Sequence, residues 1–429
     1  MTESDIQILQ KEIDAVIEKY NREDFINQDF EVYSKSFKET YFQNQNLHTN
    51  KRVCEVIGCK NITIKKSHTI PKSSILKNIV FEGHLLTPKF DSSDNHPKNI
   101  MSKIGINNAS VFPGFCTKHE DIFKSFEIDG KIDNVNKALL QTFRTLCRER
   151  VYRENELEIN KIIREKYKKK INSEAQESIT KALSKYPQFE NVKDIELKGI
   201  DSIIDSLSKL DSFLISPLEQ IKIFETSIYS ALLKLPTKDK LIIRVANFDT
   251  HLPVSICGIG NQVYLKDKVE TDSYLLLNVM PRKDSTSVIC VGLERDKLLI
   301  QNYIDSSFSN PLFLLNMIES FMVNGSDHWF VNPKFWETLS EVKQKKILYD
   351  ILFTEDSHLD EYPISIFDDV RMYIISTLKK NINTRTEKIT EFEKEIIDKE
   401  IKKIKSADYE IITDTNILAE KLWNRLQKH

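Results

Sequence analysis

Two short pairs of potential metal ligands constrain this chain more than any other feature of its sequence. Cys54 and Cys59 are separated by four residues, and Cys116 and His119 by two. A tetrahedral zinc ion takes four thiolate or imidazole ligands, and chains often supply them as two short pairs, each on a tight turn or at a helix start. We therefore expect the four side chains to share one structural zinc ion. The alternative is that the pairs are unrelated and His119 is a surface residue.

The cysteine content and the first residues of the chain bear on this choice. The chain has 6 cysteines among 429 residues, and its start, MTESDIQILQKEIDAVIEKY, has neither a basic opening nor an apolar run. We therefore expect a cytoplasmic protein, in which a close cysteine pair is more typical of a metal site than of a disulfide. No run approaches the roughly 18 apolar residues of a membrane span. Cys147, Cys257 and Cys290 stand singly in apolar surroundings, which predicts buried, inert thiols.

The length of the chain predicts more than one core, because single hydrophobic cores rarely grow to this size. With 40% hydrophobic and 29% charged residues, the composition is typical of a folded, helix-rich chain. We expect a predominantly helical α+β protein. The four predicted segments are N-terminal helices over residues 1–50, a small zinc-bound ββα finger with little core of its own over 51–132, a helical arm or hairpin over 133–235, and an α+β domain over 236–429.

The predicted arm carries apolar residues at the spacing of a coiled-coil seam. They are Ile200, Ile203, Leu207, Leu210 and Leu214. Two heptads favour packing against another helix of the same chain over a dimer. Ser173 and Gln176 fit a capping box and predict that a new helix starts there.

The C-terminal segment changes to strand-like runs separated by turn residues, which predicts an antiparallel meander. The runs are KLIIRVANF, LPVSICGIG, QVYLKD, SYLLLNVMP and TSVICVGL. Asn332 and Pro333 predict a helix start. Trp329 and Trp336 are more typical of core residues than of a base-stacking platform. The charged helix over residues 384–406 alternates Glu and Lys, which favours a solvated face.

Between the two ligand pairs lies NITIKKSHTIPKSSIL. A strand ending in a histidine, a turn with proline and then a helix, all bracketed by zinc ligands, resembles the His-Me finger or HNH nucleases in their treble-clef form. The resemblance covers residues 51–128. It implies an endonuclease with His68 as general base, with the two ligand pairs clasping the finger and with Mg²⁺ or Mn²⁺ as catalytic ion. SHTIPKS together with ASVFPGFCTKH also resembles uncharacterised bacterial proteins with this finger, which implies a role in anti-phage defence.

The charge pattern is consistent with a nucleic-acid partner, with DNA expected over RNA. The formal net charge is −2, yet residues 51–90 contain eight basic and two acidic residues. Lys65, Lys66 and Lys72 flank His68 and can bind backbone phosphates. A neutral imidazole suits the removal of a proton from the attacking water, and a cation stabilises the leaving oxygen.

The sequence departs from the HNH pattern at Ser67, where many members carry an acidic metal ligand, because a hydroxyl is a poor ligand for a hard cation. Glu120, Asp121 and Asn108 are the remaining candidates, and we expect Asn108 and Asp121 to act beside His68. A non-catalytic zinc module that binds nucleic acid or a protein is the alternative function. A third is a structural adaptor that acts through the helices of residues 133–235. A protein partner is expected at this helical arm or at the C-terminal domain.

Overall fold

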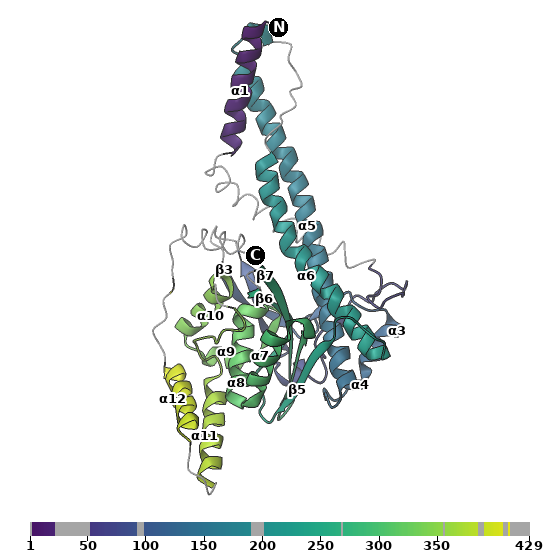
Figure 1. Ribbon diagram of the computed structural model, residues 1–429, viewed down its shortest axis with the longest axis vertical. Helices are drawn as coiled ribbons and strands as arrows, with labels where there is room; N and C mark the ends of the chain where they lie inside the picture. Colours follow the sequence, from purple (N-terminus) through teal and green to yellow (C-terminus); the bar gives the residue numbers. More distant parts are fainter. Residues whose placement is uncertain are drawn as a thin grey trace. The chain divides into compact units, whose positions relative to one another are not determined.

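The computed structural model describes residues 2–21, 52–91, 98–189, 201–266, 269–354, 357–384, 390–405 and 411 (Figure 1). The chain forms two compact units. The first combines Met1–Asn50 with Tyr152–Leu218, and the second combines Lys51–Val151 with Glu219–His429. Among the described helices, none has both the length and the apolar character that crossing a bilayer requires.

The first unit is helical. It contains α1 (Glu3–Asn21), the later part of α5 (Val135–Leu183) and the earlier part of α6 (Asp201–Leu233). The apolar face of α1 packs against α5 and against a short 3₁₀ turn, Pro187–Phe189. Long helices over 135–183 and 201–233 confirm the predicted helical character of the arm.

The helix start predicted at Ser173 is wrong, because α5 runs through this position without a break. Ile171, Ala175 and Ile179 are four residues apart along one face and are fully buried against α1. This tertiary packing outweighs the local cap signal. The predicted helix within residues 30–42 and Ile200 lie outside the described residues, as do the side chains of residues 201–214, so the seam stays a prediction.

The second unit is built on a seven-stranded sheet in the order β3-β2-β9-β6-β7-β8-β5. The strands are β2 (His84–Asp91), β3 (Lys98–Gly105), β5 (Leu241–Phe248), β6 (Val254–Lys266), β7 (Val269–Pro281), β8 (Thr286–Leu293) and β9 (Trp329–Val331). Every neighbouring pair is antiparallel. The predicted meander is confirmed in β5 to β8, with the runs LPVSICGIG and QVYLKD joined in the single strand β6.

Two strands of this sheet come from the segment between the zinc-ligand pairs. β2 and β3 form a hairpin, and β9 links it to the rest of the sheet because Val331 pairs with both Leu86 and Val254. The predicted finger over residues 51–132 and the predicted domain over 236–429 therefore share one sheet and one compact unit.

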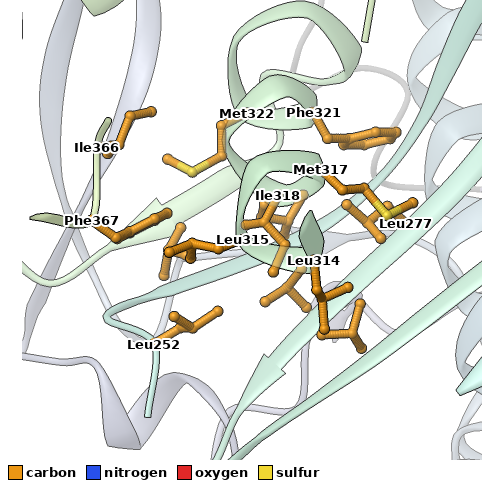
Figure 2. Close-up of a cluster of buried hydrophobic side chains, with 14 of the residues drawn as sticks. Leu252, Leu277, Leu314, Leu315, Met317, Ile318, Phe321, Met322, Ile366 and Phe367 are labelled. Carbon is orange, nitrogen blue, oxygen red and sulfur yellow. The ribbon is translucent and has the colours of Figure 1, made fainter. Parts of the chain in front are cut away.

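Helices cover both faces of the sheet. They include α7 (Lys297–Ser309), α8 (Pro311–Ser320), α9 (Pro333–Thr338) and α10 (Glu341–Phe353), while α11 (Asp368–Thr384) packs against α8 and α12 (Glu391–Lys405) packs against α11. Figure 2 shows α8 side chains such as Leu315 and Ile318 packed with Leu277 of β7, while Phe367 closes the cluster from the loop before α11. On the opposite face, α5 side chains reach Cys257 and Asn278. Strand β8 is buried along its whole length because both faces are covered.

Several local predictions for this unit are confirmed. The Asn332 side chain caps α9 by accepting a hydrogen bond from the Phe335 amide, with Pro333 at the first helical position. Trp329 and Trp336 are core residues, with ring centroids 6.1 Å apart. Cys147, Cys257 and Cys290 are all fully buried.

The charged helix α12 departs from the predicted solvated face. Glu400 and Lys403 are buried, and Glu400 pairs with Arg371 of α11. Arg371 also pairs with Glu319 of α8, and the Lys403 ammonium lies 3.2 Å from the Glu319 carboxylate. Buried charges require such partners, so the alternation of Glu and Lys supplies an internal ion network as well as surface charge.

Candidate metal centre

The first ligand pair lies on a small knuckle, residues 52–63. Val53 and Ile62 form an antiparallel bridge, and the Cys54 amide donates to the Asn61 carbonyl at 2.9 Å. A turn between them places Cys59 opposite Cys54, with Gly58 at φ 79°, a conformation that glycine adopts without strain. The C-x4-C spacing therefore corresponds to a hairpin that directs two thiols to one side.

The second pair lies at the start of α3 (Thr117–Glu120). Cys116 is the N-cap residue, and its carbonyl accepts hydrogen bonds from the amides of His119 and Glu120. The helical turn brings the imidazole of His119 back over the Cys116 thiol, with Nδ1 3.6 Å from Sγ. This is the helix-start geometry that the C-x2-H spacing predicts.

The four side chains meet in one cluster. The Cys54 Sγ lies 3.3 Å from the His119 Nδ1, the Cys59 and Cys116 sulfurs are 4.0 Å apart, and all four donor atoms lie within 4.8 Å of one another. Zinc–sulfur bonds of about 2.3 Å place tetrahedral donors about 3.8 Å apart. Three thiols and one imidazole at these separations fit a zinc ion, so the cluster can bind a metal such as zinc.

The surroundings shift the pKa values of two of the thiols, Cys54 and Cys116, in opposite directions. Burial raises the pKa of Cys54 to about 11. Burial acts in the same direction on Cys116, but hydrogen bonds from the His119 backbone and the Asn61 amide bring the pKa of Cys116 below its usual value. Asn61 therefore supports a thiolate at Cys116 from outside the donor set, as partners of metal ligands commonly do.

His68 lies between the two ligand pairs in the sequence. It belongs to β1 (Ser67–His68), which pairs with β4 (Val111–Phe112). Its Nε2 is shielded from solvent and has no hydrogen-bond partner. Burial, and then the positive charges of Arg144, Lys72 and Lys66, lower the pKa of His68 to about 4. The imidazole is therefore neutral near pH 7, with one unpartnered nitrogen.

Ser67 ties the β1–β4 pair to the helix that carries His119. Its hydroxyl donates to the Glu120 carboxylate at 3.0 Å and accepts from the Phe115 amide at 3.1 Å. Arg144 of α5 is fully buried and pairs with Glu120 and with Glu127, each at 2.6 Å. Burial raises the pKa of Glu120, against the opposing charge of Arg144. The Glu120 carboxylate is thus committed to Ser67 and Arg144.

The predicted phosphate-binding lysines lie exposed around His68. The Lys66 ammonium donates to Asn108 Oδ1 at 2.8 Å, and Lys72 donates to Asn107 Oδ1 at 3.3 Å. The segment before β4 therefore holds two amines near the histidine. Each ammonium has three protons, so both retain donors for a ligand. Lys65 is also exposed.

The other two predicted catalytic residues, Asn108 and Asp121, bond to different lysines. Asn108 accepts a hydrogen bond from Lys66, the residue before β1, whereas the exposed Asp121 carboxylate pairs with Lys124 at 2.8 Å. Within the described ranges, the Cys/His cluster is the single group of three or more potential metal-ligating side chains.

Sequence reasoning missed Arg144, Asn107 and the link between Ser67 and Glu120. The available signal for Arg144 was its position among Leu139, Phe143 and Leu146, since an arginine on an apolar helix face needs a buried anionic partner. Sequence alone does not identify that partner, because Glu120 and Glu127 precede the helix and are more than four turns of chain away from Arg144.

Comparison of the chain with protein-family models, curated proteins and solved structures found no match.

Proposed function

We propose that the Cys/His cluster organises a treble-clef finger that binds the phosphate backbone of a nucleic acid, with DNA favoured over RNA. The observation that carries this proposal is the pair of amines, Lys66 and Lys72, which precede and follow β1 in the sequence and donate to Asn108 and Asn107. Fixed ammonium groups bind backbone phosphates without reading sequence. Lys65 extends the same exposed surface.

The salt dependence of binding tests this proposal. Labelled duplex DNA, single-stranded DNA and RNA are titrated with the full-length protein at several salt concentrations. Each phosphate contact contributes about 0.9 to the slope of log K against log salt on duplex DNA. We expect Lys66→Ala and Lys72→Ala each to weaken binding and to lower this slope by about 1.

Lys185→Ala is the charge-matched control, because Lys185 is an exposed lysine of the first unit. It should leave binding and slope unchanged. Binding that is insensitive to salt, or that all three variants weaken equally, excludes the Lys66 and Lys72 surface as the contact.

Metal-dependent phosphodiester hydrolysis is the second candidate function, and the state of His68 favours it. A neutral imidazole with an unpartnered Nε2 is ready to take the proton of a water that attacks phosphorus. Lys66 and Lys72 hold the scissile phosphate beside this nitrogen, and Asn108 orients the Lys66 amine. A bound Mg²⁺ or Mn²⁺ would stabilise the leaving oxygen, and the ligands expected from the sequence, Asn108 and Asp121, would have to exchange their bonds to Lys66 and Lys124 for the ion.

The shielding of Nε2 and the commitment of Glu120 to Arg144 support the non-catalytic alternative instead. A cutting assay separates the two functions. Plasmid and RNA are incubated with the protein in Mg²⁺ or Mn²⁺, beside His68→Ala and a control, His84→Ala, which changes a histidine at the start of β2. Hydrolysis by His68 predicts cutting that only His68→Ala abolishes. Binding without cutting in every buffer favours the non-catalytic module, for which a role in anti-phage defence is recognition rather than cleavage.

A further inference from the structure

The three thiols of the Cys/His cluster differ in their access to solvent. Cys54 and Cys116 are 5% and 4% exposed, whereas Cys59 is partly exposed on the surface turn of the knuckle. The residue before it, Gly58, has no other atom within 4 Å of the position that a Cβ would occupy. A small reactive molecule therefore meets Cys59 before the other two thiols.

The same turn brings Cys59 close to a second thiol. The sulfurs of Cys59 and Cys116 are 4.0 Å apart, and a disulfide bond requires about 2.05 Å. Cys116 is held at the start of α3 by the hydrogen bonds of its carbonyl. Cys59 lies in a turn closed by one backbone hydrogen bond, from its own amide to the Val56 carbonyl. A movement of about 2 Å by the Cys59 sulfur closes the gap to Cys116.

We propose that Cys59 is an oxidation site and that Cys116 is its resolving partner, so that a hydroperoxide converts the metal centre into a disulfide. The Cys59 thiolate attacks the peroxide, an S–O bond forms as the O–O bond breaks, and hydroxide leaves. The Cys116 thiolate then attacks the Cys59 sulfur, an S–S bond forms as the S–O bond breaks, and a second hydroxide leaves. The two thiolates lose two electrons in total, and the peroxide gains them.

The disulfide removes two of the four donors for zinc and leaves Cys54 and His119. Two ligands hold zinc far more weakly than four, so oxidation releases the ion. The change begins at the N-cap of α3, and Glu120 of this helix bonds to Ser67 beside His68. Oxidation thus reaches β1, the strand between the two lysines proposed to bind phosphates. The inference rests on the zinc centre and stands whether or not nucleic acid binds.

The test uses the full-length, zinc-loaded protein and hydrogen peroxide. Released zinc is followed with a chromogenic chelator, and disulfides are mapped by peptide mass spectrometry. We expect loss of the bound zinc together with a peptide that links Cys59 to Cys116. Cys59→His keeps four donors without the exposed thiol, so it should bind zinc and release it several-fold more slowly. Cys147→Ser, which removes a buried thiol outside the cluster, should behave like the unchanged protein.

Three results overturn the proposal. They are zinc retained at peroxide concentrations that oxidise the zinc-free protein, equal release rates from Cys59→His, and a disulfide mapped to a pair that excludes Cys59. If Cys59→His does not bind zinc, timed alkylation of the unchanged zinc-loaded protein tests the proposal instead, because it gives the order in which the thiols react. Cys59 must then be labelled before Cys54 and Cys116, and labelling of either buried thiol first contradicts the inference.

Discussion

The knuckle and the helix-covered sheet belong to the same compact unit but orient their apolar side chains in opposite ways. On the knuckle, residues 52–63, Val53, Ile57 and Ile62 are 48%, 68% and 55% exposed. In the sheet, residues such as Leu277 and Leu315 are fully buried. Burial of apolar side chains therefore contributes little to the folding of the knuckle, whereas it stabilises the sheet.

The segments next to the knuckle are intermediate between these extremes. Phe115 and Phe123 are buried with ring centroids 4.7 Å apart, and Phe115 also lies against Phe143 of α5. The sequence-based expectation of little core across residues 51–132 is thus wrong for this part. It describes the knuckle alone, where the Cys/His cluster can supply metal ligation in place of apolar burial.

Loss of the metal should have the largest effect. Structural zinc contributes ~10–16 kcal/mol of apparent binding free energy in small zinc-dependent folds. We expect Cys116→Ser to lose zinc and to unfold the knuckle and α3 while the sheet stays folded. In hydrogen exchange, the amides of Cys54, Thr63 and His119, all hydrogen-bonded in the structure, should lose protection, and those of β7 should keep it.

The matched control is Cys290→Ser, at an equally buried thiol in the sheet. It should lower the free energy of unfolding yet retain about one zinc per chain by elemental analysis. If the knuckle amides of Cys116→Ser stay protected from hydrogen exchange, the knuckle does not depend on the metal for its folding. The contrast between the knuckle and the sheet is then wrong.

Removal of a buried arginine should have the second-largest effect on the free energy of unfolding, and the effect should differ between the two regions. Arg371→Met leaves the carboxylates of Glu319 and Glu400 buried without this partner, which typically costs about 3–5 kcal/mol. Arg144→Met leaves Glu120 and Glu127, whose side chains are 21% and 26% exposed. Water reaches these carboxylates, so we expect a smaller loss. Denaturant titrations of both variants measure the difference, and an equal or reversed order contradicts it.

Truncation of apolar side chains should have effects that follow burial. Leu315→Ala opens a cavity beside the sheet and should lower the free energy of unfolding by about 2–5 kcal/mol. Val53→Ala changes a side chain that is half exposed, and it should change the free energy by no more than about 0.5 kcal/mol. Calorimetry or denaturant titration compares the two. A large loss in Val53→Ala indicates that the knuckle has apolar contacts of its own.

A modest effect is expected on the pH dependence of stability. Burial lowers the pKa of His358 from its usual 6.5 to about 4. Between these values the unfolded chain takes up a proton that the folded chain excludes, so stability falls as pH decreases from 6.5 towards 4. At about pH 5.5 the loss is on the order of 1 kcal/mol. His358→Gln should lose less stability than the unchanged protein over this range, and parallel curves exclude His358 as a contributor.

Local features of the sequence predicted local features of the structure well. The spacing of the ligand pairs predicted the Cys/His cluster because a hairpin turn and a helix start each direct two side chains to one point. Asn332 and Pro333 predicted the start of α9 because a cap acts within one turn. Strand-like apolar runs separated by turn residues predicted β5 to β8, since turn residues mark the ends of short strands.

The features that sequence reasoning missed depend on distant partners. Nothing near Leu86 indicates that it pairs with Val331. The capping residues at Ser173 resemble a helix start, and only the contact of Ile171 and Ala175 with α1 carries α5 across them. Glu400 has the same local pattern as its solvated neighbours, and its buried partners, Arg371 and Asn316, are distant in sequence.

The pairing of β2 with β9 has a consequence for synthesis on the ribosome. Leu86 and Val331 are partners, and more than half of the chain lies between them. At about 5–20 residues per second, β2 leaves the exit tunnel on the order of ten seconds or more before β9 can cover its inner edge. During this interval the β2–β3 hairpin presents unpaired backbone groups that other nascent chains can extend. Ribosome-associated chaperones are therefore most useful to this protein after β2 emerges and before β9 is made.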